Sequence, residues 1–202
     1  FSYDGFGSVN TYTAKFNAAE VMKTQLGYDK LGRITTKIET MSGTTATFTY
    51  SYDPAGRLTE VNKDGITLST YIYDSNGNRL THSAAEATVT GNYDSQDRLI
   101  RYDTATYAYT PNGELKSKTT GTQKTDYVYD ELGNLLNVAL PDGSKIDYFV
   151  DGRNRRIGKK VNGVLIQGFI YQDRLKPIAE LDGNNNVVSR FVYATRVNVP
   201  DY

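Results

Sequence analysis

The stretch YDPAGRL, residues 52–58, decides the fold, because copies of it run along the whole chain. An Asp at the first position of a tight turn accepts hydrogen bonds from backbone amides, and Pro54 stands where such a turn favours proline. Gly56, three residues after Asp53, supplies the left-handed backbone that closes a hairpin with a bulge. The stretch therefore predicts a hairpin turn between two strands, which we call a Tyr-Asp turn.

Nine copies of this turn begin at positions 3, 28, 52, 73, 93, 109, 129, 150 and 171, some of them degenerate. A fixed period of about 21 residues is typical of an array of supersecondary units. We assign a structural, turn-forming role to the residues that carry the motif most clearly. They are Tyr28, Asp29, Gly32, Arg33, Tyr52, Asp53, Gly56, Arg57, Tyr73, Asp74, Gly77, Tyr129, Asp130 and Gly133.

A second turn follows nine or ten residues after such a glycine, as at Asp64-Gly65, Asp142-Gly143 and Asn162-Gly163. Each unit is then two strands, and turns alternate between the two edges of a sheet. We predict an all-β fold for residues 1–202, an antiparallel meander of about nine hairpin units. A sheet of more than about 10 strands curls, so we expect a long curved or spiralling strip. Residues 18–23 form a single helical turn at most.

Before each Tyr-Asp turn, aromatic residues alternate with small or aliphatic ones, as in Tyr71-Ile72-Tyr73 and Tyr127-Val128-Tyr129. Because side chains alternate between the faces of a strand, both aromatics of each triplet share one face. Two interpretations stay open. The rings pack between units, or they form a platform on which sugar rings stack.

The composition excludes several classes of protein. The 23 basic and 23 acidic residues balance, so the chain lacks the basic surface that nucleic acids require. It has no cysteine, which excludes disulfides and thiolate metal sites. No stretch approaches the roughly 18 apolar residues of a membrane span, and no signal peptide is visible. The first residue is not Met, so we expect a fragment or a processed piece.

Candidate sites are few. We expect His82, the single histidine, to be an ordinary exposed residue. The run that begins at Asp182 imitates a calcium loop, but Val187 and Tyr193 stand where such a loop needs Gly and Glu, which favours a plain turn. Arginines that follow the turns, including Arg79 and Arg155, can pair with the preceding Asp or with neighbouring units. We predict no catalytic residue, no cofactor and no metal.

The motif Tyr-Asp-x-x-Gly-Arg-Leu at this spacing resembles the YD repeats of bacterial Rhs proteins, wall-associated proteins, Tc toxin shell components and teneurins. The resemblance runs from Tyr3 to about Tyr193. It implies a β-strip that spirals into a hollow shell around a variable C-terminal toxin, with a core region that cleaves itself at an aspartate. Residues 194–202 resemble the lead-in to that core, whereas residues 53–56, Asp-Pro-Ala-Gly, are a repeat turn.

We therefore expect a non-catalytic segment of shell wall in a secreted or cell-surface bacterial protein. Its expected partners are its own C-terminal core and toxin domain. Edge-to-edge self-association is expected through the terminal strands, residues 8–16 and 186–193, because unpaired strand edges recruit other chains. The alternative is an adhesive or glycan-binding module that uses the aromatic face. Buried Tyr rings favour the wall, and rings exposed in a groove favour carbohydrate as a partner.

Overall fold

The computed structural model describes residues 1–85 and 87–201. Strands and turns account for the regular structure of these residues, and no helix occurs among them. The predicted all-β fold, an antiparallel meander of hairpins, is confirmed. The chain divides into two compact units, residues 1–103 and 104–202.

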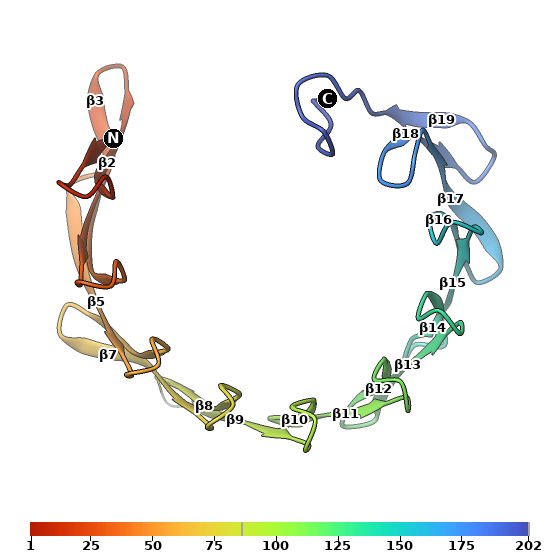
Figure 1. Ribbon diagram of the computed structural model, residues 1–202, viewed down its shortest axis with the longest axis horizontal. Helices are drawn as coiled ribbons and strands as arrows, with labels where there is room; N and C mark the ends of the chain where they lie inside the picture. Colours follow the sequence, from red (N-terminus) through yellow and green to blue (C-terminus); the bar gives the residue numbers. More distant parts are fainter. Residues whose placement is uncertain (86, 202) are drawn as a thin grey trace. The chain divides into compact units, whose positions relative to one another are not determined.

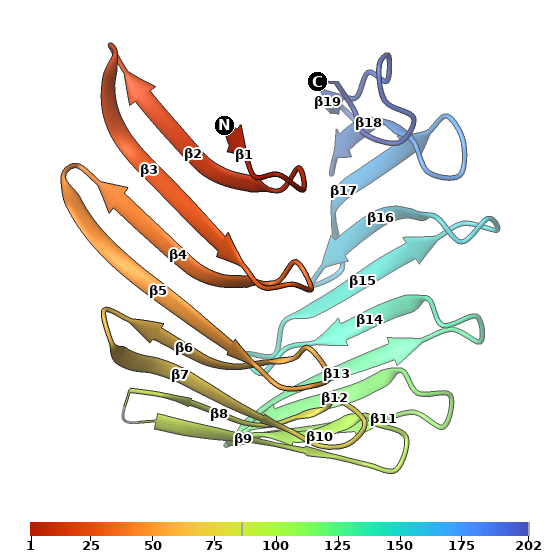
Figure 2. The same ribbon diagram turned by 60° about the vertical axis from the view of Figure 1, so that its left-hand side comes forward.

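In the first unit, each strand pairs antiparallel with the next one along the chain. Figure 2 shows β2 to β9 side by side in this order. The strands are β1 (Ser2–Tyr3), β2 (Val9–Phe16), β3 (Ala19–Tyr28), β4 (Ile34–Met41), β5 (Thr44–Tyr52), β6 (Leu58–Lys63), β7 (Ile66–Tyr73), β8 (Arg79–Ala84), β9 (Ala87–Tyr93) and β10 (Leu99–Tyr102).

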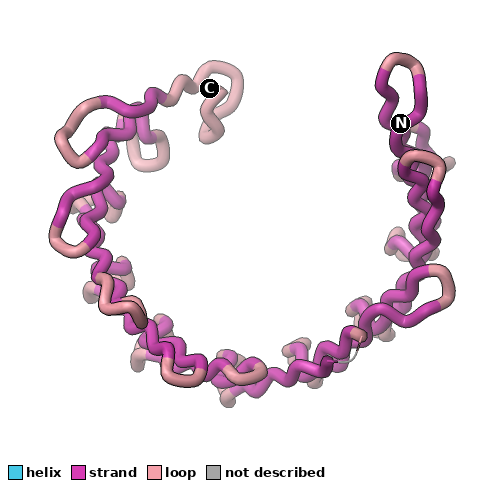
Figure 3. Tube along the Cα trace, turned by 180° about the vertical axis from the view of Figure 1, so that it is seen from behind, coloured by secondary structure: helices cyan, strands magenta, loops and turns pink. Residues whose placement is uncertain are grey.

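The second unit repeats this plan, again with antiparallel pairing of consecutive strands. Its strands are β11 (Ala105–Tyr109), β12 (Leu115–Thr120), β13 (Gln123–Tyr129), β14 (Leu135–Ala139), β15 (Lys145–Val150), β16 (Arg156–Val161), β17 (Val164–Tyr171), β18 (Pro177–Asp182) and β19 (Val187–Arg190). Within each unit the strip of strands is bent rather than flat (Figure 1), and the turns join neighbouring strands at their ends (Figure 3).

The two kinds of turn differ in backbone conformation. At a Tyr-Asp turn the strand register shifts at the Tyr, as between Ser51 and Tyr52, and Gly56 has φ +85°. Most turns at the other edge are two-residue loops, and Asn162 and Gly163 both have positive φ, at 51° and 80°. Such pairs match the right-handed twist of a hairpin. The bulge and the left-handed glycines are where the sequence predicts them.

The sheet has almost no enclosed core. Among the described residues, the buried apolar side chains are Ala105, Val138 and Ala179, and no large side chain is fully buried. In the aromatic triplets the outer rings are half-buried and the central residue is exposed, as with Val128 between Tyr127 and Tyr129. Each unit is therefore a single layer of sheet with one partly covered face.

The sequence limits residues 18–23 to a single helical turn at most, and residues 19–23 lie in β3, where Met22 pairs with Met41. The prediction for the N-terminal edge is wrong. The first edge strand is the two-residue β1, which covers only the start of β2, whereas an unpaired strand was expected over residues 8–16. The pairing of β1 with β2 therefore protects part of this edge.

The C-terminal edge also differs from expectation, because part of it is covered. The chain after β19 folds back, and the amide of Asp201 donates a hydrogen bond to the Val192 carbonyl at 2.8 Å. The Asp201 carboxylate accepts bonds from the amides of Ala194 and Thr195 and from the Thr195 hydroxyl. This bond protects one backbone group of the outer edge, and edge-to-edge association stays a prediction.

Candidate functional site

The Asp of each Tyr-Asp turn organises the turn. In the second Tyr-Asp turn along the chain, Asp29 Oδ1 accepts hydrogen bonds from the amides of Leu31 and Arg33 at 2.9 and 3.0 Å. The Asp29 amide donates to the Arg33 carbonyl, and the Gly32 amide donates to the Asp29 carbonyl. The Asp53 turn has the same two backbone bonds, and Asp53 accepts the Arg57 amide at 2.9 Å. These carboxylates are bound to their own turns, which is a structural use of the group.

These contacts favour the charged form of the carboxylate. The backbone amide of Arg33, and then its side chain, hold the pKa of Asp29 below its usual value of 3.8 despite partial desolvation. Arg57 lowers the pKa of Asp53 in the same order of causes. The Arg155 side chain lowers the pKa of Asp151 to about 2. The turns are thus built around ionised aspartates.

The residue four positions after the Asp joins one turn to the next, and we call this contact a turn junction. Arg57 Nε lies 2.6 Å from Oδ2 of Asp53 in its own turn. Its guanidinium stacks on the Tyr73 ring of the next turn, 4.9 Å from the centroid, and Nη1 donates to the Asp74 carbonyl at 2.7 Å. Guanidinium groups suit such a combination of carboxylate, ring face and carbonyl.

Two further junctions have this geometry. Arg33 pairs with Asp29 at 2.7 Å and stacks on Tyr52 at 4.7 Å. Arg155 stacks on Tyr171 at 5.0 Å and donates to the Asp173 carbonyl at 3.0 Å. From the sequence, these arginines are expected only to pair with the preceding Asp or with a neighbouring repeat. The stacking on the next tyrosine depends on the spacing of neighbouring hairpins, which the sequence does not specify.

Asparagine replaces arginine at two junctions, and the sequence reasoning missed both. Asn78 Nδ2 donates to Asp74 in its own turn and to Asp97 in the next, at 2.9 and 2.6 Å. Asn134 donates to Asp130 and to Asn154 at 2.8 and 3.2 Å. The sequence drew attention instead to Arg79, which lies one residue further on and donates to the Tyr102 hydroxyl.

The fourth residue of the next turn sets what the junction residue meets. Arginine reaches over Gly56 and Gly77, where a Cβ on the glycine would meet the Nη1 atom at 3.6 and 3.9 Å. A glycine also stands at this position in Gly32 and Gly133, but the junction residues there are Ser8 and Glu114. Where it is Asp97 or Asn154, both with positive φ, its side chain meets an asparagine. The two asparagine pairs can be read from the sequence once the turns are aligned.

The repeat tyrosines bind to the neighbouring hairpin through their hydroxyl groups. Tyr52 donates to the Ile34 carbonyl at 2.6 Å and Tyr73 to the Leu58 carbonyl at 2.9 Å. The same bond recurs for Tyr28, Tyr93, Tyr171 and Tyr193. Half-buried rings with bound hydroxyls favour packing between neighbouring hairpins over a free sugar-binding surface.

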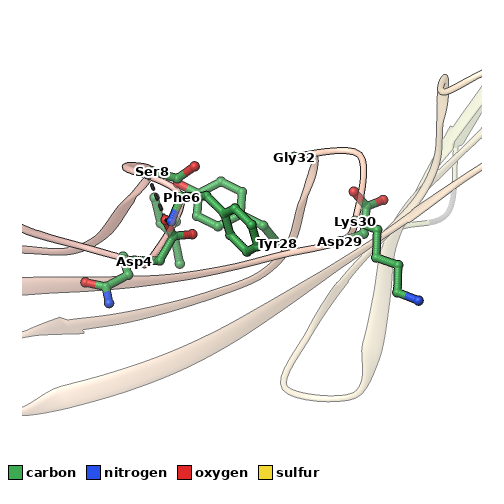
Figure 4. Close-up of a pocket in the computed structure, with 9 residues that line it drawn as sticks. Asp4, Phe6, Ser8, Tyr28, Asp29, Lys30 and Gly32 are labelled. Atoms are coloured by element: carbon green, nitrogen blue, oxygen red, sulfur yellow. Dashed lines mark hydrogen bonds between the residues drawn. The ribbon is translucent and has the colours of Figure 1, made fainter.

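Three cavities lie where the junction residue is not arginine. The largest, of about 710 Å³, is lined by Ser8 and Tyr28 (Figure 4). One of about 480 Å³ is lined by Glu114 and Tyr129, and one of about 350 Å³ by Asn134. The row of turns therefore has an opening at Ser8, at Glu114 and at Asn134.

The other candidates from the sequence have ordinary settings. His82 is half-buried in β8, not exposed, and its ring stacks on Tyr71 with centroids 4.8 Å apart. Asp182 forms a turn whose Oδ1 accepts the amides of Asn184 and Asn186. Over residues 1–85 and 87–201, no cluster of three or more His, Asp or Glu side chains is arranged to hold a metal. No helix in this described part is long and apolar enough to cross a membrane.

Comparison with known proteins gives consistent matches. Mouse teneurin-3 (Mus musculus) is 30% identical over 190 residues, which cover 84% of this chain and 7% of that protein. The tRNA nuclease WapA of Bacillus subtilis (strain 168) is 30% identical over 140 residues, 66% of this chain and 6% of that protein. The chain thus spans less than a tenth of the length of these relatives.

A solved structure, TcdB2-TccC3 without its hypervariable C-terminal region, is 15% identical, with a TM-score of 0.48. The similarity covers 88% of this chain and 10% of that one. The family model described as Teneurin YD-shell matches residues 1–201. The chain belongs to the Teneurin YD-shell family, and its role is structural, as part of such a shell.

Proposed function

We propose that residues 1–202 are one repeat array that forms a non-catalytic segment of shell wall in a longer protein, where the shell encloses a C-terminal toxin. The junctions carry this proposal, because the polar groups of the Tyr-Asp turns are engaged in holding one repeat to the next. Arg57 alone contacts Asp53, Tyr73 and the Asp74 carbonyl. Such a use of ionisable groups favours a wall over a catalytic centre.

The single-layer sheet supports the same proposal. A sheet without a second layer has little apolar burial, so its stability depends on the contacts between neighbouring repeats. The face opposite the tyrosines carries exposed apolar residues, among them Ile72, Val128 and Ile170. A wall that is covered by other parts of a longer protein would use such a face.

We further propose that the partners are the protein's own C-terminal core and toxin domain, with residues 194–202 as the lead-in to that core. The location proposed is the outside or the surface of a bacterial cell. One relative is named a nuclease, but this chain covers only 6% of it. We propose that such an activity belongs to a part of that protein outside the match.

The alternative function, adhesion or glycan binding by the aromatic face, has less support. The hydroxyl groups of tyrosines such as Tyr52 and Tyr73 donate to backbone carbonyls of the sheet itself. A sugar-binding platform would keep these groups for the ligand.

Limited proteolysis of the longer protein tests the proposed enclosure. We expect its C-terminal domain to resist protease in the wild type and to be cleaved at least tenfold faster when Gly133→Val strains a repeat turn at φ +80°. Gly152→Val is the matched control, because a Cβ there meets nothing within 4 Å and its φ is not positive. Equal cleavage of the C-terminal domain in wild type and Gly133→Val would contradict enclosure.

A further inference from the structure

The first turn junction differs from the others in that its own side chain cannot span it. The residue four positions after Asp4 is Ser8, whose side chain is too short to reach the next turn. We call the 710 Å³ cavity at this place the open junction. Asp4, Ser8, Tyr28, Asp29 and Gly32 are among its lining residues. Figure 4 shows these residues together, with Lys30 directed away from the Tyr28 ring.

The acceptors of a filled junction are all present at the open one. Oδ1 of Asp4 accepts the amides of Phe6 and Ser8, as in the other turns. Among the described residues, Oδ2 of Asp4 has no partner, whereas the corresponding oxygens of Asp29 and Asp53 hold an arginine Nε. The Asp29 carbonyl corresponds to the carbonyls of Asp74 and Asp53, which Arg57 and Arg33 reach in their junctions.

The Tyr28 ring and Gly32 at the open junction also have the same setting as the ring and the glycine of a filled junction. The Tyr28 hydroxyl donates to the Val9 carbonyl at 2.7 Å, so its ring is fixed as Tyr52 and Tyr73 are fixed. No cation among the described residues stacks on that ring. A Cβ on Gly32 would meet nothing within 4 Å, although a Cβ on Gly56 would meet the Arg33 guanidinium at 3.6 Å.

We propose that the open junction binds a guanidinium group, supplied by an arginine side chain of another polypeptide segment. The planar guanidinium can donate Nε to Asp4 Oδ2, donate a terminal NH₂ to the Asp29 carbonyl and lie on the Tyr28 ring at once. An ammonium group is a point charge and cannot make the three contacts together. The chain itself shows the bound form, because Arg33, Arg57 and Arg155 occupy the corresponding places.

The two smaller cavities do not share these features. At the junction after Thr110, a Cβ on Gly133 would lie 3.6 Å from Glu114 Oε1, so a carboxylate already reaches the site. At the next one, Asn134 connects Asp130 to Asn154. Among the described residues, only the open junction combines three features: a glycine in the next turn, an Asp oxygen without a partner and a tyrosine ring on which no cation stacks.

A titration observed by NMR tests the proposal, with Nα-acetyl-arginine amide as the probe. We expect saturable shifts of the Tyr28 ring signals, assigned by their loss in Tyr28→Leu, with a dissociation constant on the order of millimolar. The uncharged isostere Nα-acetyl-citrulline amide should give no saturable shift. Nα-acetyl-lysine amide should bind at least fivefold more weakly than the arginine probe.

Two variants complete the test. Ser8→Arg should fill the junction from within and abolish binding, while Arg33→Ser should open a second site over Tyr52 and double the stoichiometry. Far-UV spectra of both variants should match that of the wild type, which checks that the fold is kept. The proposal is wrong if Tyr28 shows no saturable shift, if the citrulline probe acts like the arginine probe, or if Ser8→Arg still binds.

Discussion

Two neighbouring turn junctions differ in the side chain that stands in them. One joins the second and third Tyr-Asp turns, and the other lies between the first and the second. In the former, Arg33 connects Asp29 to Tyr52 and lies over Gly56. In the latter, Ser8 leaves a cavity of about 710 Å³ above Tyr28 and Gly32. The turns themselves have the same hydrogen bonds in both places.

This comparison separates two tasks within the repeat. In the turns that begin at Asp4, Asp29 and Asp53, the Asp and the Gly form the turn, because their hydrogen bonds and positive φ are present whether or not the junction is filled. The junction residue joins the turns, because its contacts reach the next repeat.

Acidification should have the largest effect, because it acts on many turns at once. The folded-state pKa values of Asp29 and Asp53 lie below 3.8, and that of Asp151 is about 2. Between the folded and unfolded values the unfolded chain binds more protons, so stability that is present above about pH 4 is lost as the pH falls toward 2. Thermal unfolding between pH 7 and pH 2 measures this. An unfolding temperature that is the same at pH 2.5 and pH 7 would contradict it.

Valine at a turn glycine should lower the free energy of unfolding by about 1–3 kcal/mol, because a β-branched residue is strained at positive φ. Gly56→Val and Gly32→Val should differ by less than about 1 kcal/mol, since the strain is in the backbone of both turns. Denaturant titration measures both, with Gly5→Val as control at a position without positive φ. A much larger loss at Gly56 would mean that the junction and the turn are not separate.

Removal of a junction arginine should have a smaller effect. Arg57→Ala loses the stacking on Tyr73 and the bond to the Asp74 carbonyl, about 1–2 kcal/mol in all. Arg57→Lys should fall between wild type and Arg57→Ala, because an ammonium keeps only part of these contacts. Arg153→Ala, at an exposed side chain, is the control and should change stability by less than about 0.5 kcal/mol. Equal stability of Arg57→Ala and Arg153→Ala would contradict the role of the junction.

The turns and strands are predictable from sequence because their causes are local. Asp53 and Gly56 fix the bulged hairpin within a few residues. The strand over residues 19–23 has no such local signal, because the preceding turn, Asn17-Ala18, contains no glycine and yet has positive φ at both residues. Pairing of β3 with β2 and β4 determines the conformation there.

The junctions are only partly predictable, because their contacts join residues about 20 positions apart. The Asp-Arg pair within a turn is local, but the stacking of Arg57 on Tyr73 depends on how hairpins lie side by side. The links made by Asn78 and Asn134 follow from the side chain at Asp97 or Asn154 in the next turn. The fold-back of Asp201 onto Val192 likewise has no signal in the repeat pattern.

A double-mutant cycle between Arg57 and Tyr73 tests most directly whether arginine joins neighbouring repeats. Unfolding free energies are measured for wild type, Arg57→Ala, Tyr73→Leu and the double variant. We predict a coupling of about 0.5–1.5 kcal/mol, against a coupling near zero for the matched cycle of Ser8→Ala and Tyr28→Leu at the open junction. Additive effects of Arg57→Ala and Tyr73→Leu would show that the arginine does not join the two turns.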